Sequence, residues 1–78
     1  MRTFVGYRPN PPEHYYEQGA ANSPNEPQYE GVIFDDGFVA VRWLTLQHST
    51  ELWPDFDGFL RIHGHPEYGT RIVWNDEH

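Results

Sequence analysis

The chain has 78 residues, twelve Asp and Glu against five Arg, no lysine, and a formal net charge of −7. This charge argues against direct binding to DNA, RNA or anionic membranes, because such binding requires clustered cations. No apolar run of about 18 residues is present to span a membrane, and no signal-peptide stretch follows Arg2. We therefore expect a cytoplasmic protein with a single small domain over residues 1–78 and a thin core.

Cysteine is absent, so neither disulfides nor thiolate metal sites support this core. The chain is instead rich in aromatic residues, with three Trp, five Tyr and five Phe. Each buried ring removes ~150–250 Å² from water. We therefore expect aromatic packing to replace the cross-links that stabilise other small domains.

The N-terminal segment TFVGY (3–7) has the β-branched and aromatic residues of a strand. We expect an edge strand with a bulge at Gly6. Residues 9–28 contain five of the seven prolines and show no apolar periodicity. Their composition predicts an irregular arm or long loop.

The clearest local pattern is a β-hairpin over residues 29–44, in which two apolar runs flank Asp36 and Gly37. A two-residue type I′ turn at Asp-Gly places Glu30 opposite Trp43. Because side chains alternate along a strand, this register predicts one core face made of Val32, Phe34, Val39, Val41 and Trp43.

A third strand is predicted at STELW (49–53), and a helix at residues 54–64 follows it. Pro54 suits the first position of that helix, and Gly64 suits a left-handed C-terminal cap. One helical face carries Phe56, Phe59, Leu60 and His63.

TRIVW (70–74) predicts a last strand. The expected fold class is α+β: a small two-layer sandwich whose antiparallel β-sheet of three to five strands has one short helix packed on one face.

The carboxylate pairs have structural explanations. Asp35 and Asp36 fall in the hairpin turn, where Asp is common, and Asp55 and Asp57 fall where a helix dipole favours anions. No glycine pattern marks a nucleophile elbow or a phosphate loop, and the lack of lysine excludes a Schiff base. We therefore predict no catalytic residue, no cofactor and no enzyme activity.

His63 and His65 form the one local pattern that resembles a metal site. Zinc takes three or four ligands at defined spacing, and this pair supplies two. A hydrogen-bonded core histidine is the ordinary explanation for His63, so no metal ligand is assigned. A small metal-binding protein that uses His63 and His65 is kept as an alternative function.

Acidic and tyrosine side chains are the candidate partner-binding residues. Tyrosines anchor protein interfaces, and carboxylates steer a protein toward a basic surface. The predicted set is Asp35, Asp36, Glu51, Asp55, Asp57, Tyr15, Tyr16 and Tyr29. The sequence leaves open a second explanation, in which the carboxylates form an ordinary solvated surface and the tyrosines cover the sheet.

The segments GVIFDDGFVAVRWLT, HSTELW, IHGH and TRIVW, in this order, resemble small proteins encoded by actinobacteria and their phages. The similarity covers residues 31–74, omits the arm, and implies no activity for any residue. A phage origin implies action in the host cytoplasm on a host protein.

Charge and resemblance together favour a non-catalytic, acidic protein-binding module that inhibits or redirects a host protein. Its sharpest form is a nucleic-acid mimic that docks on a basic surface. A self-associating structural or assembly component, for example a homodimer, is a further alternative.

Overall fold

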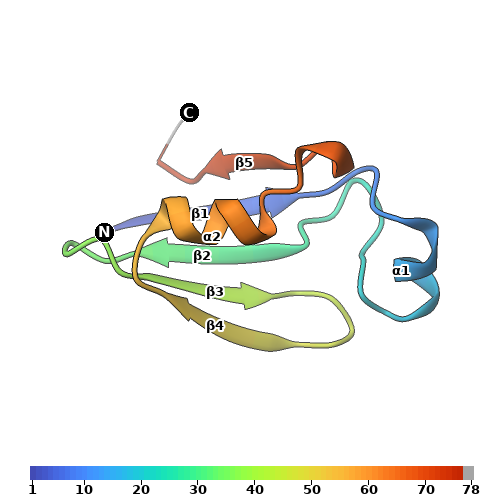
Figure 1. Ribbon diagram of the computed structural model, residues 1–78, viewed down its shortest axis with the longest axis horizontal. Coiled ribbons are helices and arrows are strands. Elements are labelled where there is room, and N and C mark those ends of the chain that lie inside the picture. Colours follow the sequence, from blue (N-terminus) through green and yellow to red (C-terminus); the bar gives the residue numbers. More distant parts are fainter. Residues whose placement is uncertain (77–78) are drawn as a thin grey trace.

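A computed structural model describes residues 1–76 as a five-stranded antiparallel sheet with one main helix on one face (Figure 1). The strands are β1 (Arg2–Tyr7), β2 (Tyr29–Ile33), β3 (Val39–Trp43), β4 (Ser49–Trp53) and β5 (Arg71–Trp74). The helices are α1 (Glu13–Glu17) and α2 (Phe56–His63), and a 3₁₀ turn, η1, spans Pro66–Tyr68. The predicted α+β class is confirmed. Within these residues no helix is both long enough and apolar enough to cross a membrane.

The strand order is β4-β3-β2-β1-β5, so the N-terminal strand lies inside the sheet. The prediction of an edge strand with a bulge at Gly6 is wrong. Gly6 pairs regularly with Tyr29 on one side and with Ile72 on the other. β1 is therefore the strand that joins β5 to the rest of the sheet.

Gly6 and Gly31 are required because aromatic rings from the neighbouring strand occupy the space above them. A Cβ atom on Gly6 would lie 2.1 Å from Cζ of Tyr29, and one on Gly31 would lie 2.3 Å from Cζ of Phe4. These residues are direct partners in the β1–β2 pairing. Each strand thus places one buried ring over a glycine of the other.

The β2–β3 hairpin forms where it was predicted, but its loop has three residues, 35–37, instead of two. The N–H of Phe34 donates to the carbonyl of Phe38, and the N–H of Gly37 donates to the carbonyl of Phe34. Gly37 has a φ of 93°, as in a type I turn that ends in a glycine bulge. The carboxylate of Asp36 accepts the N–H of Phe38 and holds the loop closed.

The longer loop shifts the register by one residue, so each side chain of β2 lies on the opposite face of the sheet from the predicted one. Tyr29 and Ile33 belong to the face that packs under α2, with Gly31 between them. Val32 lies on the other face, and Phe34 is exposed beyond the end of the strand. The predicted core face is therefore right for β3 and wrong for β2.

The core lies between α2 and the sheet, and aromatic rings dominate it. Its fully buried side chains are Phe4, Tyr29, Val39, Val41 and Phe59. Rings meet edge to face: the ring centres of Phe4 and Phe56 are 5.1 Å apart, and those of Tyr29 and Phe59 are 5.3 Å apart. Such contacts add to the free energy gained from burying the rings.

α2 begins after Asp55, which caps it by accepting a hydrogen bond in the first turn, so Pro54 lies outside the helix. The predicted left-handed conformation at Gly64 is also wrong. Gly64 has a helical φ of −68°, and the positive φ falls on His65. Glycine is needed at position 64 for space, since a Cβ atom there would lie 2.3 Å from the carbonyl oxygen of Leu60.

Residues 9–28 form a long loop that contains α1 and lies at the end of the sheet opposite to the β2–β3 hairpin loop (Figure 1). Asn22 fixes this segment by donating to the carbonyl groups of Pro27 and Leu44. The buried side chain of Gln28 accepts the Asn22 N–H and donates to its carbonyl. The segment is thus bonded to the sheet despite its high proline content.

Candidate partner-binding surface

Two loops and the first turn of α2 bring four of the predicted acidic residues to one end of the molecule. Residues 34–38 join β2 to β3, and residues 54–55 join β4 to α2. Because Val39 lies opposite Trp53, both connections leave the sheet at the same end (Figure 1). We call this surface the acidic end and define it as Asp35, Asp36, Asp55 and Asp57 together with the exposed rings of Phe34 and Phe38.

The loops use these carboxylates for their own structure and still leave them at the surface. Asp35 has an 88% exposed side chain and accepts a hydrogen bond from the N-terminal ammonium, which lowers its pKa. Asp36 accepts the Phe38 N–H, and Asp55 caps α2. Asp57 is exposed in the first turn of α2, where the helix dipole stabilises its charge.

Exposed apolar side chains lie at the same end of the molecule. Phe34 is 41% exposed and Phe38 is 37% exposed, and they flank the two aspartates of the hairpin loop. Exposed aromatic side chains beside charged ones are typical of surfaces that bind proteins. The acidic end therefore combines electrostatic attraction with an apolar contact area.

Glu51 does not belong to the acidic end, because the core uses its carboxylate. Its Oε1 accepts the indole N–H of Trp43 at 3.1 Å and that of Trp53 at 3.4 Å. The same oxygen lies 3.3 Å from Nε2 of His63. Half-buried indole N–H groups need an acceptor, so Glu51 stabilises the fold, which the sequence analysis did not anticipate.

The three predicted tyrosines do not form a shared surface. Tyr29 is fully buried by the register shift and has no surface to offer a partner, which corrects that part of the prediction. Burial raises its pKa to about 12. Tyr15 is half-buried with its hydroxyl 3.3 Å from that of Tyr68, and Tyr16 is 40% exposed on α1, far from the acidic end.

Arg8 is a buried cation that sequence reasoning missed, since nothing in its context between Tyr7 and Pro9 signals burial. It is 6% exposed and borders a hollow of about 550 Å³. Its Nη2 donates to the carbonyl of His63, the last residue of α2, and its guanidinium lies 4.9 Å from the ring centre of Trp43.

Desolvation lowers the pKa of Arg8. The negative end of the helix dipole and the faces of the surrounding rings compensate its charge. Its Nε is buried with no hydrogen-bond partner among residues 1–76. Arg8 therefore links the end of β1 to the end of α2 and is a structural residue of this fold.

His63 and His65 lie near the C-terminal end of α2, and residues 1–76 place no third metal ligand beside them. Among the described residues, no group of three or more His, Asp or Glu side chains could hold a metal ion. Burial, Arg8 and His65 lower the pKa of His63, whereas Glu51 opposes the shift. His65 bonds Glu67 through Nδ1 at 2.8 Å. The structure thus gives the alternative of a metal-binding protein no further ligand.

Residues 29–76 match the family described as Acb5 phage protein, and the chain belongs to this family. The match extends from β2 to β5 and includes the acidic end, whereas β1 and α1 lie outside it. It supports the phage part of the resemblance found in the sequence, and the actinobacterial part stays a prediction. No curated protein and no solved structure matches the chain significantly.

Proposed function

We propose that this phage protein binds a host protein through the acidic end and thereby inhibits or redirects it. The observation that carries the proposal is that four aspartates and two exposed phenylalanine rings lie at the same end of the fold. Charge steers such a surface toward a basic partner, and buried rings then supply most of the affinity. Membership in a phage protein family supports a host target.

The proposed action is non-catalytic. The carboxylates of the acidic end are exposed to water, whereas acid–base catalysis depends on sites that shift pKa values by burial or by neighbouring charges. Occupying a partner's surface needs no such site. The expected effect on the host protein is therefore stoichiometric.

In its sharpest form, the proposal makes the partner a nucleic-acid-binding protein whose basic surface accepts carboxylates in place of phosphates. Asp36 comes from the β2–β3 loop, and Asp55 and Asp57 come from the start of α2 beside it, so the three carboxylates do not follow one helix face. They would fit a compact basic site. DNA or RNA added during capture should then release the partner, because both ligands compete for the same cations.

Affinity capture from a lysate of the host bacterium tests the proposal with three forms of the full chain. The test variant is D36N/D57N, which removes two charges but leaves the Asp55 cap and the acceptor at position 36 in place. The matched control is E13Q/E17Q, which removes the same charge from α1 at the other end of the molecule. Each form is used at low and at high salt.

The wild type and E13Q/E17Q should retain the same partner at low salt, and D36N/D57N should bind it roughly tenfold more weakly. High salt should reduce retention by the wild type. Equal retention by all three forms would show that the acidic end is not the contact surface. Retention that ignores salt would rule out the electrostatic basis of the proposal.

A further inference from the structure

The face of the sheet opposite α2 has no covering layer in the described chain, and we call it the open face. Its side chains form two rows across the strands in the order β4, β3, β2, β1, β5. The first row is Leu52, Ala40, Val32, Thr3 and Asn75. The second row is Thr50, Arg42, Glu30, Val5 and Val73.

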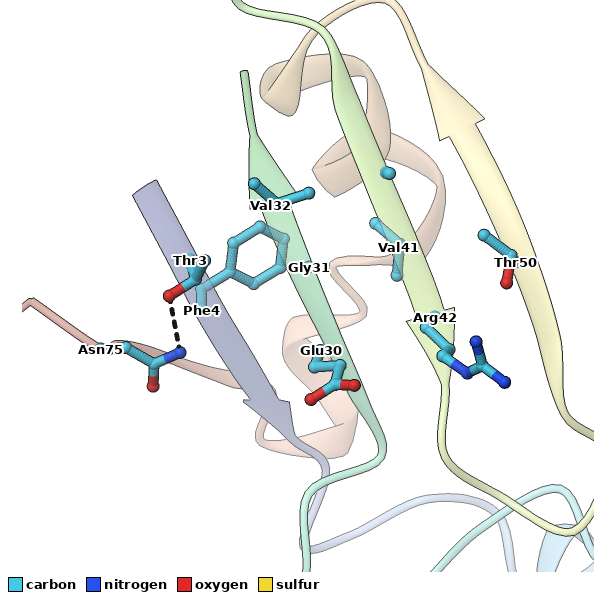
Figure 2. A pocket seen from close by; sticks show the side chains of 10 residues that line it. Thr3, Phe4, Glu30, Gly31, Val32, Val41, Arg42, Thr50 and Asn75 are labelled. Atoms are coloured by element: carbon cyan, nitrogen blue, oxygen red, sulfur yellow. Dashed lines mark hydrogen bonds between the residues drawn. The ribbon is translucent and has the colours of Figure 1, made fainter. Parts of the chain in front are cut away.

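Antiparallel sheets commonly leave one face in water, but that face is then mostly polar. The open face instead carries exposed apolar side chains, with Leu52 66% exposed and Val73 38% exposed. It is also hollowed by about 390 Å³ among side chains that include Thr3, Val32 and Ala40. Figure 2 shows Thr3 and Val32 on neighbouring strands at this recess. The face has both a protruding apolar side chain and a recess.

Glu30 and Arg42 lie at the same recess as direct cross-strand partners of opposite charge (Figure 2). Both side chains are exposed, and no ion pair or hydrogen bond joins them in residues 1–76. A complementary surface would place an anion over Arg42 and a cation over Glu30. The required spacing is that of two neighbouring strands, about 4.8 Å.

A second copy of the chain has this charge pattern. Two facing sheets can be related by a two-fold axis that lies midway between them, runs parallel to the strands and passes between β2 and β3. This axis places β2 of each copy over β3 of the other, and each row of one copy over the same row of the other. It brings Arg42 of each copy over Glu30 of the other. Packed sheets lie ~10 Å apart, a gap that an arginine and a glutamate side chain bridge together.

The same axis exchanges β4 with β1, so it brings Leu52 of each copy over Thr3 of the other. Thr3 borders the recess together with Val32. The most exposed apolar side chain of the open face therefore meets the recess of the facing sheet. The same two-fold axis therefore pairs the opposite charges of Glu30 and Arg42 and places Leu52 at the facing recess.

We propose that two copies of this protein pack face to face through their open faces, with reciprocal Glu30–Arg42 ion pairs and with Leu52 in the facing recess. The dimer keeps α2 on the outside of both sheets. Because the axis follows the strands, both acidic ends point the same way. This inference does not depend on the proposed function, since association is measured on the purified protein alone.

Sedimentation equilibrium of the full chain over a concentration series tests the dimer, with E30R, R42E and E30R/R42E as variants. Each single reversal puts like charges face to face and should weaken association at least about tenfold. The double reversal restores opposite charges at the wild-type net charge. It should recover most of the association.

A second pair of variants tests the shape of the interface. L52D should weaken the dimer, whereas I62D, which changes an exposed apolar side chain on α2, should not. Circular dichroism and thermal unfolding establish that each variant is folded. A wild type that stays monomeric at every concentration overturns the inference. So does a double reversal no better than the single ones, or an equal effect of L52D and I62D.

Discussion

The two faces of the sheet differ although they are made by the same strands. Phe4 and Tyr29 are fully buried under α2, whereas their neighbours Val5 and Glu30 lie on the open face and reach water. Consecutive residues thus occupy different environments because side chains alternate along a strand. Burial of side chains under α2 therefore supplies the free energy of folding, whereas the side chains of the open face stay accessible to other molecules.

The largest expected effect that tests this comparison is Phe4→Ala against Val5→Ala. Phe4 contacts the rings of Tyr29, Phe56 and Trp74, so its removal should lower the free energy of unfolding by ~3–5 kcal/mol. Val5→Ala should cost about 1 kcal/mol or less. Urea unfolding followed by tryptophan fluorescence measures both. Equal losses would mean that the two faces do not differ in this way.

Gly31→Ala should have the next largest effect. The new Cβ atom would meet the buried ring of Phe4, and overpacking of this kind costs ~1–3 kcal/mol. For a domain of this size each kcal/mol lowers Tm by ~4–8 °C. Val32→Ala, one residue further on the open face, is the control and should shift Tm less. A larger shift for Val32→Ala would contradict the assignment of the two faces.

The smallest expected effect is a change of Tm with pH that arises from the protonation of His63. Because its pKa is lowered in the folded protein from 6.5, the unfolded chain binds more protons just below that pH. The contribution of neutral His63 to the stability of the fold is therefore complete above pH 6.5 and is lost as the pH falls through the pKa of His63 in the folded protein. Tm should decrease on acidification through this range.

The variant H63Q should show a weaker dependence of Tm on pH than the wild type does. H48Q is the matched control, because His48 is exposed between β3 and β4. It should keep the dependence seen in the wild type. If H63Q and the wild type lose Tm in parallel on acidification, His63 is not the group responsible.

The strands and α2 could be predicted from local patterns, but the hairpin register could not. Asp36 and Gly37 suit a two-residue loop as well as the three-residue loop that forms. What favours the observed register is a contact from outside the hairpin, since Gly31 must face the core to make room for the ring of Phe4. Phe4 lies in a strand that a single hairpin pattern does not include.

The candidate surface was likewise predictable only in part. Composition identified the aspartates, and the lengths of the strands and loops then explain why Asp36 and Asp55 lie at one end. The structural use of Glu51 depends on two indole groups that reach it from positions 43 and 53. Tyr29 is buried because of the observed register. The predicted register differs by one residue and therefore placed this side chain on the opposite face of the sheet.

The position of β1 has a consequence for how the chain folds as it is made. Within residues 1–76, β5 pairs with β1 alone, so this edge of β1 stays unpaired until β5 has been made, although β1 can pair with β2 earlier. A nascent chain can close the β2–β3–β4 meander early, but pairing of Phe4 with Trp74 requires that residues 4–74 have all been made. Loss of the first seven residues should therefore detach two strands from the sheet and not one.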